Sequence, residues 1–342
     1  MKRVCSIWIP FEIGLKNRVE NRKSMGVRFQ FCMVLISLVV NVPDSAAWGP
    51  QGHSVIGLIA DGHLKPEVKE LIAKKFNINS LADVATWADR TRKKRKEESS
   101  WHYTNIEEGE WTYNAERDCP DGACVTEKIH EFSGILRSTS LRERKKDALK
   151  FLVHFVGDVH QPLHLGNLKD RGGGTLRFLY KGKDVSLHYL WDGGLIDWDG
   201  EPPQANGNMF ISPSECVDGL TSHCYLPPSL EGGEPPQVNE RRHTPPPKAR
   251  SLFPPGVARE SLLKYAARLN GRVSEEEVSA WSLSTVSDWA NESRSLALKV
   301  AYRVDKGGLS KAYIKRGREV INLRLTQAGV RLAHLLNTIL TF

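Results

Sequence analysis

One stretch, HFVGDVHQPLH at residues 154–164, predicts both a helix and a metal site. His154 and Asp158 are four residues apart, so on a helix they lie on one face and can bind the same metal ion. Pro162 ends that helix, which lets His164 turn towards a second metal ion. His160 lies within the stretch, but we expect a structural role for it rather than a role as a ligand.

The same spacing recurs at His188 and Asp192. This second pair follows Gly172–Gly174 and two alternating stretches, Thr175–Tyr180 and Asp184–His188, which predict a small β-hairpin. A lone histidine on an apolar face is usually a core residue, but two pairs joined by a hairpin are hard to explain in that way. The glycine run lacks the Gly-Lys-Ser/Thr of a phosphate-binding loop, which excludes that class of nucleotide site.

Further candidate ligands lie upstream. Asp89 ends an amphipathic stretch for which Ser80 is a candidate N-cap, and His102 follows in Trp-His-Tyr. Trp48 and His53 lie five residues apart. A free α-amino group with its own carbonyl can chelate a metal, so Trp48 is a candidate ligand if it becomes the first residue.

The N-terminal region has the layout of a secretory signal peptide. An apolar run, Gln30–Val42, has Arg28 before it and Ser45-Ala46-Ala47 after it. Cleavage there would leave Trp48 as residue one of a secreted or periplasmic protein. An uncleaved membrane anchor is the alternative, although the run is short for a membrane span. We interpret residues 1–24 as an extension upstream of a true start at Met25.

The composition is that of a globular protein, because 40% of the residues are hydrophobic and 26% are charged. Residues 1–47 carry seven basic and three acidic side chains, so their removal lowers the net charge from +8 to +4. That charge suits an anionic substrate without identifying one.

The rest of the chain predicts one mainly α domain over residues 48–342. The Pro- and Gly-rich segment at about 200–259 cannot sustain a packed core, so we expect a disordered insertion or translated non-coding sequence there. Helical periodicity covers Val55–Phe76 with a break at Lys65-Pro66, Val125–Leu136, Lys145–Val159, Arg259–Leu269, Ser274–Val304 and Ser310–Leu340.

Four cysteines remain after residue 47, in two close pairs. Cys119 and Cys124 flank a short loop, and Cys216 and Cys224 lie in the insertion. In an exported protein both pairs predict local disulfides. A thiolate metal site is the alternative, but neither pair has the two-residue spacing that such sites use.

This combination of residues resembles the zinc-dependent single-strand nucleases and 3′-nucleotidases of the nuclease S1 and P1 type. That family is related to the bifunctional plant nucleases and to zinc phospholipase C. The resemblance runs from Trp48 to about Gly200 and resumes at Trp289–Ser293 and Ala328–Ala333. It implies a helical, zinc phospholipase C-like fold and three zinc ions in one cleft.

The resemblance also implies a role for each candidate. Catalytic roles fall to Asp158, Asp89 and Arg92, and Arg92 would stabilise charge on the phosphoryl oxygens. The implied zinc ligands are Asp89, His102, His154 and Asp158 for the first ion, Trp48, His53 and a shared Asp158 for the second, and His164, His188 and Asp192 for the third.

Substrate contacts are implied at Arg92, Tyr103 and Asn105. Tyr103 lies where the family has an aromatic residue that stacks on a base. Asn105 replaces an aspartate found in many members, which leaves the base preference open, and Gly174 replaces a frequent asparagine. The implied substrates are single-stranded DNA, RNA and 3′-nucleotides, cut to 5′-phosphate products by a monomer without stable membrane insertion.

Two other functions remain open from the sequence. A phospholipase C would use similar zinc geometry on a different phosphodiester. An inactive, zinc-stabilised nucleic-acid-binding protein would account for the changes at Asn105 and Gly174 and for the insertion.

Overall fold

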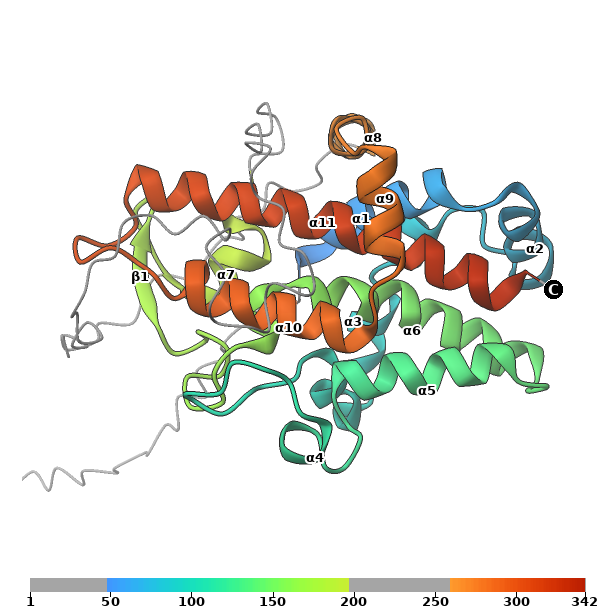
Figure 1. Ribbon diagram of the computed structural model, residues 1–342, viewed down its shortest axis with the longest axis horizontal. Coiled ribbons are helices and arrows are strands. Elements are labelled where there is room, and N and C mark those ends of the chain that lie inside the picture. The colour runs from blue at the N-terminus through green and yellow to red at the C-terminus, as the bar shows by residue number, and fades with distance from the viewer. Residues whose placement is uncertain (1–47, 197–258, 342) are drawn as a thin grey trace, which may run out of the picture. The chain divides into compact units, whose positions relative to one another are not determined.

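The computed structural model describes residues 48–196 and 259–341 (Figure 1). The expected signal peptide, the insertion and the pair Cys216 and Cys224 lie outside the described residues. Across the part of the chain that is described, no helix is both long and apolar enough to cross a membrane.

The described residues are mainly helical, as predicted. The α-helices are α1 (Gly49–His63), α2 (Pro66–Phe76), α3 (Trp87–Arg92), α4 (Ala115–Asp118), α5 (Val125–Arg137), α6 (Arg142–His160), α7 (Leu187–Tyr189), α8 (Arg259–Asn270), α9 (Glu275–Ser282), α10 (Val286–Leu296) and α11 (Lys311–Leu340). Short 3₁₀ or π segments are η1 (Leu81–Asp83), η2 (Lys96–His102), η3 (Pro162–Leu165), η4 (Leu190–Gly194) and η5 (Ala297–Ala301).

The predicted hairpin is present as an antiparallel pair, β1 (Arg177–Tyr180) and β2 (Lys183–Ser186). Its register pairs Arg177 with Ser186 and Tyr180 with Lys183. The second strand ends before His188, where the sequence pattern extended it. The Ser186 hydroxyl accepts from the Tyr189 backbone N–H and starts α7, so His188 lies on a helical turn.

Helix α6 is the central element of the fold. Every residue from Phe151 to His160 is buried, which is the burial expected of a helix enclosed on all sides. Helices α1, α3, α5, α10 and α11 all contact it (Figure 1). The HFVGDVH stretch therefore lies in the interior of the fold.

Two predicted helices are interrupted. The stretch from Ser80 to Asp89 divides into η1 and α3. Asp61 fixes the start of η1 by accepting hydrogen bonds from the Ser80 hydroxyl and the Leu81 N–H, and α3 begins after Thr86 without a side-chain cap. The stretch from Ser274 to Val304 splits at Thr285, whose hydroxyl and the Asp288 carboxylate form a capping box that starts α10. A side-chain cap therefore begins the new helix at the second break but not at the first.

A buried ionic network fixes α10 and α11 against the end of α6. Arg331 binds both carboxylate oxygens of Glu292, at 2.6 and 2.8 Å, and donates to His160 Nε2 at 2.9 Å. Arg324 also contacts Glu292 and donates to the His160 carbonyl at 3.1 Å. His160 thus has a structural role, as expected.

Candidate metal centre

The first cluster forms around Asp158, whose side chain is fully buried on α6. His154 lies one helical turn earlier, with Nε2 3.3 Å from Asp158 Oδ2. His102, at the end of η2, brings its Nδ1 to 2.9 Å from the same oxygen and to 3.1 Å from His154 Nε2. The pair His154 and Asp158, which the helical spacing predicted, therefore meets His102, which lies 52 positions before His154.

Two further helices bring His53 close to the Asp158 carboxylate and Asp89 close to the His154 imidazole. His53 Nε2 on α1 is 3.3 Å from Asp158 Oδ1, and its ring stacks on His154 with centroids 3.8 Å apart. Asp89 Oδ1 on α3 is 3.7 Å from His154 Nε2. Gly157 permits this approach, because a Cβ there would lie 2.9 Å from His53 Nδ1.

Trp48 is fully buried at the start of α1 and next to α6. Its indole N–H donates to the Gly157 carbonyl at 2.7 Å, and its own carbonyl accepts from Gly52 at 3.1 Å. Its φ of +31° is unusual for a residue with a side chain. The N-terminal end of α1 is thus fixed one residue from Asp158 along α6.

A separate cluster contains His164, His188 and Asp192, all buried, with candidate ligand atoms within 4.8 Å of one another. His188 Nε2 is 3.6 Å from Asp192 Oδ1. Gln161 donates to the same oxygen at 2.7 Å while its own oxygen accepts the Leu163 N–H at 2.5 Å. The amide is therefore held in one orientation, a supporting contact that the sequence pattern did not identify.

Three of the histidines are fixed in one tautomer. Nδ1 donates to a backbone carbonyl in each case, from His154 to Ala85 at 2.7 Å, from His164 to His102 at 2.6 Å and from His188 to Gly172 at 2.7 Å. A carbonyl can only accept, so Nδ1 carries a proton, and in the neutral form of each ring the lone pair is on Nε2, which faces the cluster. Support of this kind is typical of metal-binding histidines.

The electrostatics of the first cluster favour an ionised carboxylate. Burial alone would raise the pKa of Asp158, but the neighbouring imidazoles of His154, His102 and His53 hold that pKa well below its usual value. Burial acts to lower the pKa of His154, yet Asp158 and Asp89 raise it to about 9. A buried anion surrounded by nitrogen donors results.

The second cluster lacks this compensation. Burial lowers the pKa of His164 to about 3 and that of His188 to about 4. Both imidazoles are therefore neutral at pH 7, the protonation state in which histidine binds a metal.

These donors fit a divalent metal. Asp89 Oδ1, Asp158 Oδ1, His53 Nε2 and His188 Nε2 are buried and lie 3.3 to 3.6 Å from an oppositely charged or polar group, yet none makes a hydrogen bond of good geometry among the described residues. Buried polar atoms normally have such hydrogen bonds, so their absence here calls for a ligand. Imidazole nitrogens and carboxylate oxygens in sets of three form a metal-binding site of the kind that zinc prefers.

The three residues expected to contact substrate are connected to the first cluster, Arg92 through a contact with Asp89, and Tyr103 and Asn105 by following His102 in the chain. Arg92 on α3 places a guanidinium nitrogen 3.3 Å from Asp89 Oδ1. Tyr103 is 38% exposed, and Asn105 is partly exposed two residues later. Between them Thr104 is buried and donates its N–H to the His164 carbonyl at 2.8 Å. Alternation thus turns Tyr103 and Asn105 away from the core.

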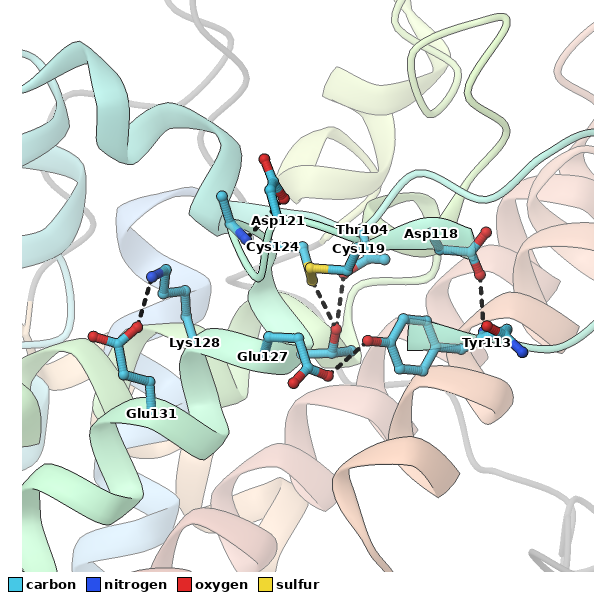
Figure 2. Close-up of a disulfide and its surroundings, with 12 residues drawn as sticks. Thr104, Tyr113, Asp118, Cys119, Asp121, Cys124, Glu127, Lys128 and Glu131 are labelled. Carbon is cyan, nitrogen blue, oxygen red and sulfur yellow. Dashed lines mark hydrogen bonds and ion pairs between the residues drawn. A yellow bond between two sulfur atoms is a disulfide. The ribbon is translucent and has the colours of Figure 1, made fainter. Parts of the chain in front are cut away.

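The predicted disulfide between Cys119 and Cys124 is formed (Figure 2). Thr126 lies 3.0 Å from Cys124 Sγ and 3.3 Å from the Thr104 hydroxyl. The Val125 N–H donates to the Tyr103 carbonyl at 3.2 Å. The disulfide loop therefore lies directly behind the segment that carries His102 and Tyr103.

Two polar residues without an expected role in metal binding, His63 and Asn291, make structural hydrogen bonds. His63 lies 2.6 Å from the Asn270 amide oxygen. Asn291, part of a formal glycosylation sequon, accepts the Tyr113 N–H at 2.8 Å with its side-chain oxygen. This contact gives Asn291 a packing role.

Comparison with known proteins agrees with this geometry. Residues 48–222 and 238–341 match the family model described as S1/P1 Nuclease. Endonuclease 3 of Arabidopsis thaliana is 27% identical over 330 residues, 92% of this chain and 97% of that protein. Nuclease P1 of Penicillium citrinum is 26% identical, over 85% of this chain and 97% of that protein. Nuclease S1 of Aspergillus oryzae is 30% identical, over 48% of this chain and 58% of that protein.

The match covers both halves of the described fold and every residue of the two clusters. The same residues include the buried His and Asp groups that fit a metal ion. The match with the family model therefore shows that this chain belongs to the S1/P1 nuclease family.

Proposed function

We propose that this chain is a zinc-dependent endonuclease that cleaves single-stranded DNA and RNA to 5′-phosphate products and also removes phosphate from 3′-nucleotides. The observation that carries the proposal is the surroundings of Asp158. This buried carboxylate is approached by imidazoles from α1, η2 and its own helix. Its Oδ1 lies 3.3 Å from His53 Nε2 but has no hydrogen bond of good geometry among the described residues.

Nine residues would hold three zinc ions in this proposal. Asp158 would be shared between two of the ions, which is consistent with the His53 and His102 nitrogens lying near its two different oxygens. When bound, zinc supplies Lewis acidity that activates water near neutral pH and stabilises charge on a phosphoryl group. The ligands would be Asp89, His102, His154 and Asp158, then Trp48, His53 and Asp158, and finally His164, His188 and Asp192.

The protein's own side chains would bind and orient the substrate. Arg92 is held beside Asp89, where a guanidinium can pair with phosphoryl oxygens. Tyr103 presents an exposed ring on which an unpaired base can stack, which favours single strands over duplexes. Asn105, on the same side of the segment, offers both a donor and an acceptor to a base edge.

We further propose that the enzyme is secreted or periplasmic and acts as a monomer. The disulfide supports an oxidising compartment. Removal of residues 1–47 would free the Trp48 amine as a ligand.

Retaining one extra residue, as in Met-Trp48, should therefore remove one zinc ion per chain. Metal counting on the mature and extended proteins checks this outcome. Sequencing the N-terminus of the exported protein checks the processing site, and equal metal content in the two forms would contradict a role for the amine.

The function is tested by assaying chelated and zinc-reloaded protein on single-stranded DNA, RNA, duplex DNA and 3′-AMP. Zinc-dependent shortening of the single strands to 5′-phosphate ends is expected, together with adenosine release. Phosphocholine release from phosphatidylcholine without nucleic-acid cleavage would instead identify a phospholipase C. Retention of nucleic acid without shortening would identify an inactive binding protein.

A further inference from the structure

Arg294 on α10 joins two loops that lie next to the candidate metal centre. Its side chain is fully buried, and its guanidinium makes four hydrogen bonds. Nε and one terminal nitrogen donate to the carbonyls of Glu110 and Glu107, at 2.8 and 2.9 Å. The other terminal nitrogen donates to the Leu165 carbonyl at 3.2 Å and to the Asn167 amide oxygen at 2.8 Å.

The acceptors of Arg294 are neutral. Within residues 48–196 and 259–341 no carboxylate lies within ion-pair distance of this guanidinium. Burial lowers its pKa, and the more distant Asp118 and Asp170 act against burial without reversing it. Arg331, a buried arginine on α11, is by contrast paired with Glu292. Burying a cation against carbonyls alone is unfavourable relative to water. The guanidinium is planar, and its N–H groups point in fixed directions. It can therefore donate to both loops at once and hold them at a fixed relative position.

The two loops are those that carry candidate substrate and metal contacts. Residues 103–110 contain Tyr103 and Asn105, and residues 164–168 begin with His164. The loops run side by side, with Ile106 N–H donating to Gly166 at 2.9 Å and Leu168 N–H donating to Ile106 at 2.9 Å. Arg294 bonds to Leu165 and Asn167, on either side of Gly166, and to Glu107 and Glu110, just after Ile106, and so connects the two loops beside this pairing.

The geometry points to Arg294 as a positioning residue, which holds the Tyr103–Asn105 segment in the place where it binds a base of the single-stranded substrate. This inference rests on the proposed function for the identity of the substrate. Arg294 itself touches backbone and amide oxygens, and it acts through Tyr103.

Lysine is the informative replacement. Arg294→Lys keeps the charge but has one ammonium in place of the fork, so it cannot bond to both loops in the same geometry. Arg331→Lys is the matched control, since it changes a buried arginine that contacts Glu292 and His160 and neither loop. Asn167→Ala is a second variant, which removes one Arg294 acceptor without altering α10.

Two substrates separate positioning from general damage. For a single-stranded oligonucleotide, Arg294→Lys and Asn167→Ala should raise KM about tenfold, as expected when the stacking contribution of one base is lost. For the same oligonucleotide with abasic tetrahydrofuran residues, which have no ring to stack on Tyr103, kcat and KM should stay within about twofold of the wild-type values. Arg331→Lys should lower the melting temperature and affect the two substrates alike.

Amide hydrogen exchange provides a readout that does not depend on catalysis. The Thr104 and Ile106 amides, which bond across the loop pair, should exchange faster in Arg294→Lys and Asn167→Ala but not in Arg331→Lys. Unchanged exchange in both loop variants would overturn the inference. Faster exchange with an unchanged oligonucleotide KM would overturn it as well, if Tyr103→Ala raises that KM. If Tyr103→Ala leaves KM unchanged, the proposed base contact fails, and the exchange result alone decides whether Arg294 holds the segment.

Discussion

Asp158 shows how much one side chain can decide in this protein. Its carboxylate is fully buried, and nitrogens of His53, His102 and His154 lie 2.9 to 3.3 Å from its oxygens. An amide in its place has the same shape but no charge and only one acceptor oxygen.

Asp158→Asn should therefore abolish cleavage and lower the metal content of the two ions that we propose share this residue. Metal analysis together with an oligonucleotide assay measures both effects. Asp147→Asn is the matched control on the same helix, because Asp147 is about half exposed and pairs with Lys150 on the surface. Turnover near the wild-type rate would refute the shared role of Asp158.

Gln161 supports Asp192 through a bond that depends on the direction of its amide. Gln161→Met fills a similar volume without the donor, so the second cluster should bind metal about ten- to a hundredfold more weakly, as is usual when such supporting contacts are lost. Titration against a competing chelator measures the affinity. Gln327→Met, in the ionic network on α11, should leave it unchanged. An unaltered affinity in Gln161→Met would show that Asp192 needs no such support.

At the scale of the secondary-structure elements, the sequence predicted the helices that depend on local sequence patterns. The helices α5 and α6 follow from apolar periodicity, and the His154–Asp158 pair follows from helical spacing. The 3₁₀ turn η1 was missed, since its start is held by Asp61, which lies 20 residues away from Leu81. Gly57 contributes too, since a Cβ there would lie 2.5 Å from the Ala82 nitrogen.

In the candidate site, too, some residues could be predicted from the sequence and others could not. The ligand residues could be named from their types and spacing and from a family resemblance. Their supports could not, because the Arg294 bond to Glu107 spans 187 positions and carries no local pattern. Similarly, the three carbonyls that orient the histidines are backbone atoms, which every residue possesses. Only packing decides which of these carbonyls faces a ring.

The loop closed by Cys119 and Cys124 acts at this scale (Figure 2). Replacing both cysteines by serine should lower the free energy of unfolding by about 2 kcal/mol, the loop-closure contribution expected for so short a loop. Because the loop abuts Thr104 and the Tyr103 carbonyl, the oligonucleotide KM should rise while metal content stays constant. Denaturant unfolding and metal analysis check the two parts. Loss of metal would show that the loop also supports His102.

Across the whole molecule, stability depends on the carboxylate of Glu292. Burial acts to raise its pKa, but Arg331 and Arg324 outweigh burial and lower that pKa below 4.5. The facing charges are these two arginines of α11, and His160 of α6 accepts from Arg331. A carboxylate with a lowered folded-state pKa stabilises above its unfolded-state pKa. This contribution is lost as the pH falls through the folded-state value.

Glu292→Gln should lower the free energy of unfolding at pH 7 by about 3 kcal/mol, since two buried arginines lose their counter-charge. The loss of stability between pH 5 and pH 3 should become shallower than in the wild type. Unfolding curves across this range measure both effects. Glu143→Gln, exposed on the first turn of α6, should change neither. A parallel pH profile in Glu292→Gln would mean that other groups govern acid unfolding.

The connections between α10, α11 and the end of α6 have a consequence for the timing of synthesis. His160 is held by arginines of α11, and the Val159 carbonyl accepts from Ser293 at 2.6 Å. When all nine candidate ligands have left the ribosome during synthesis, helices α10 and α11 have not yet emerged. The phosphodiester-cutting machinery is therefore completed last, after its own messenger RNA has been read almost to the end.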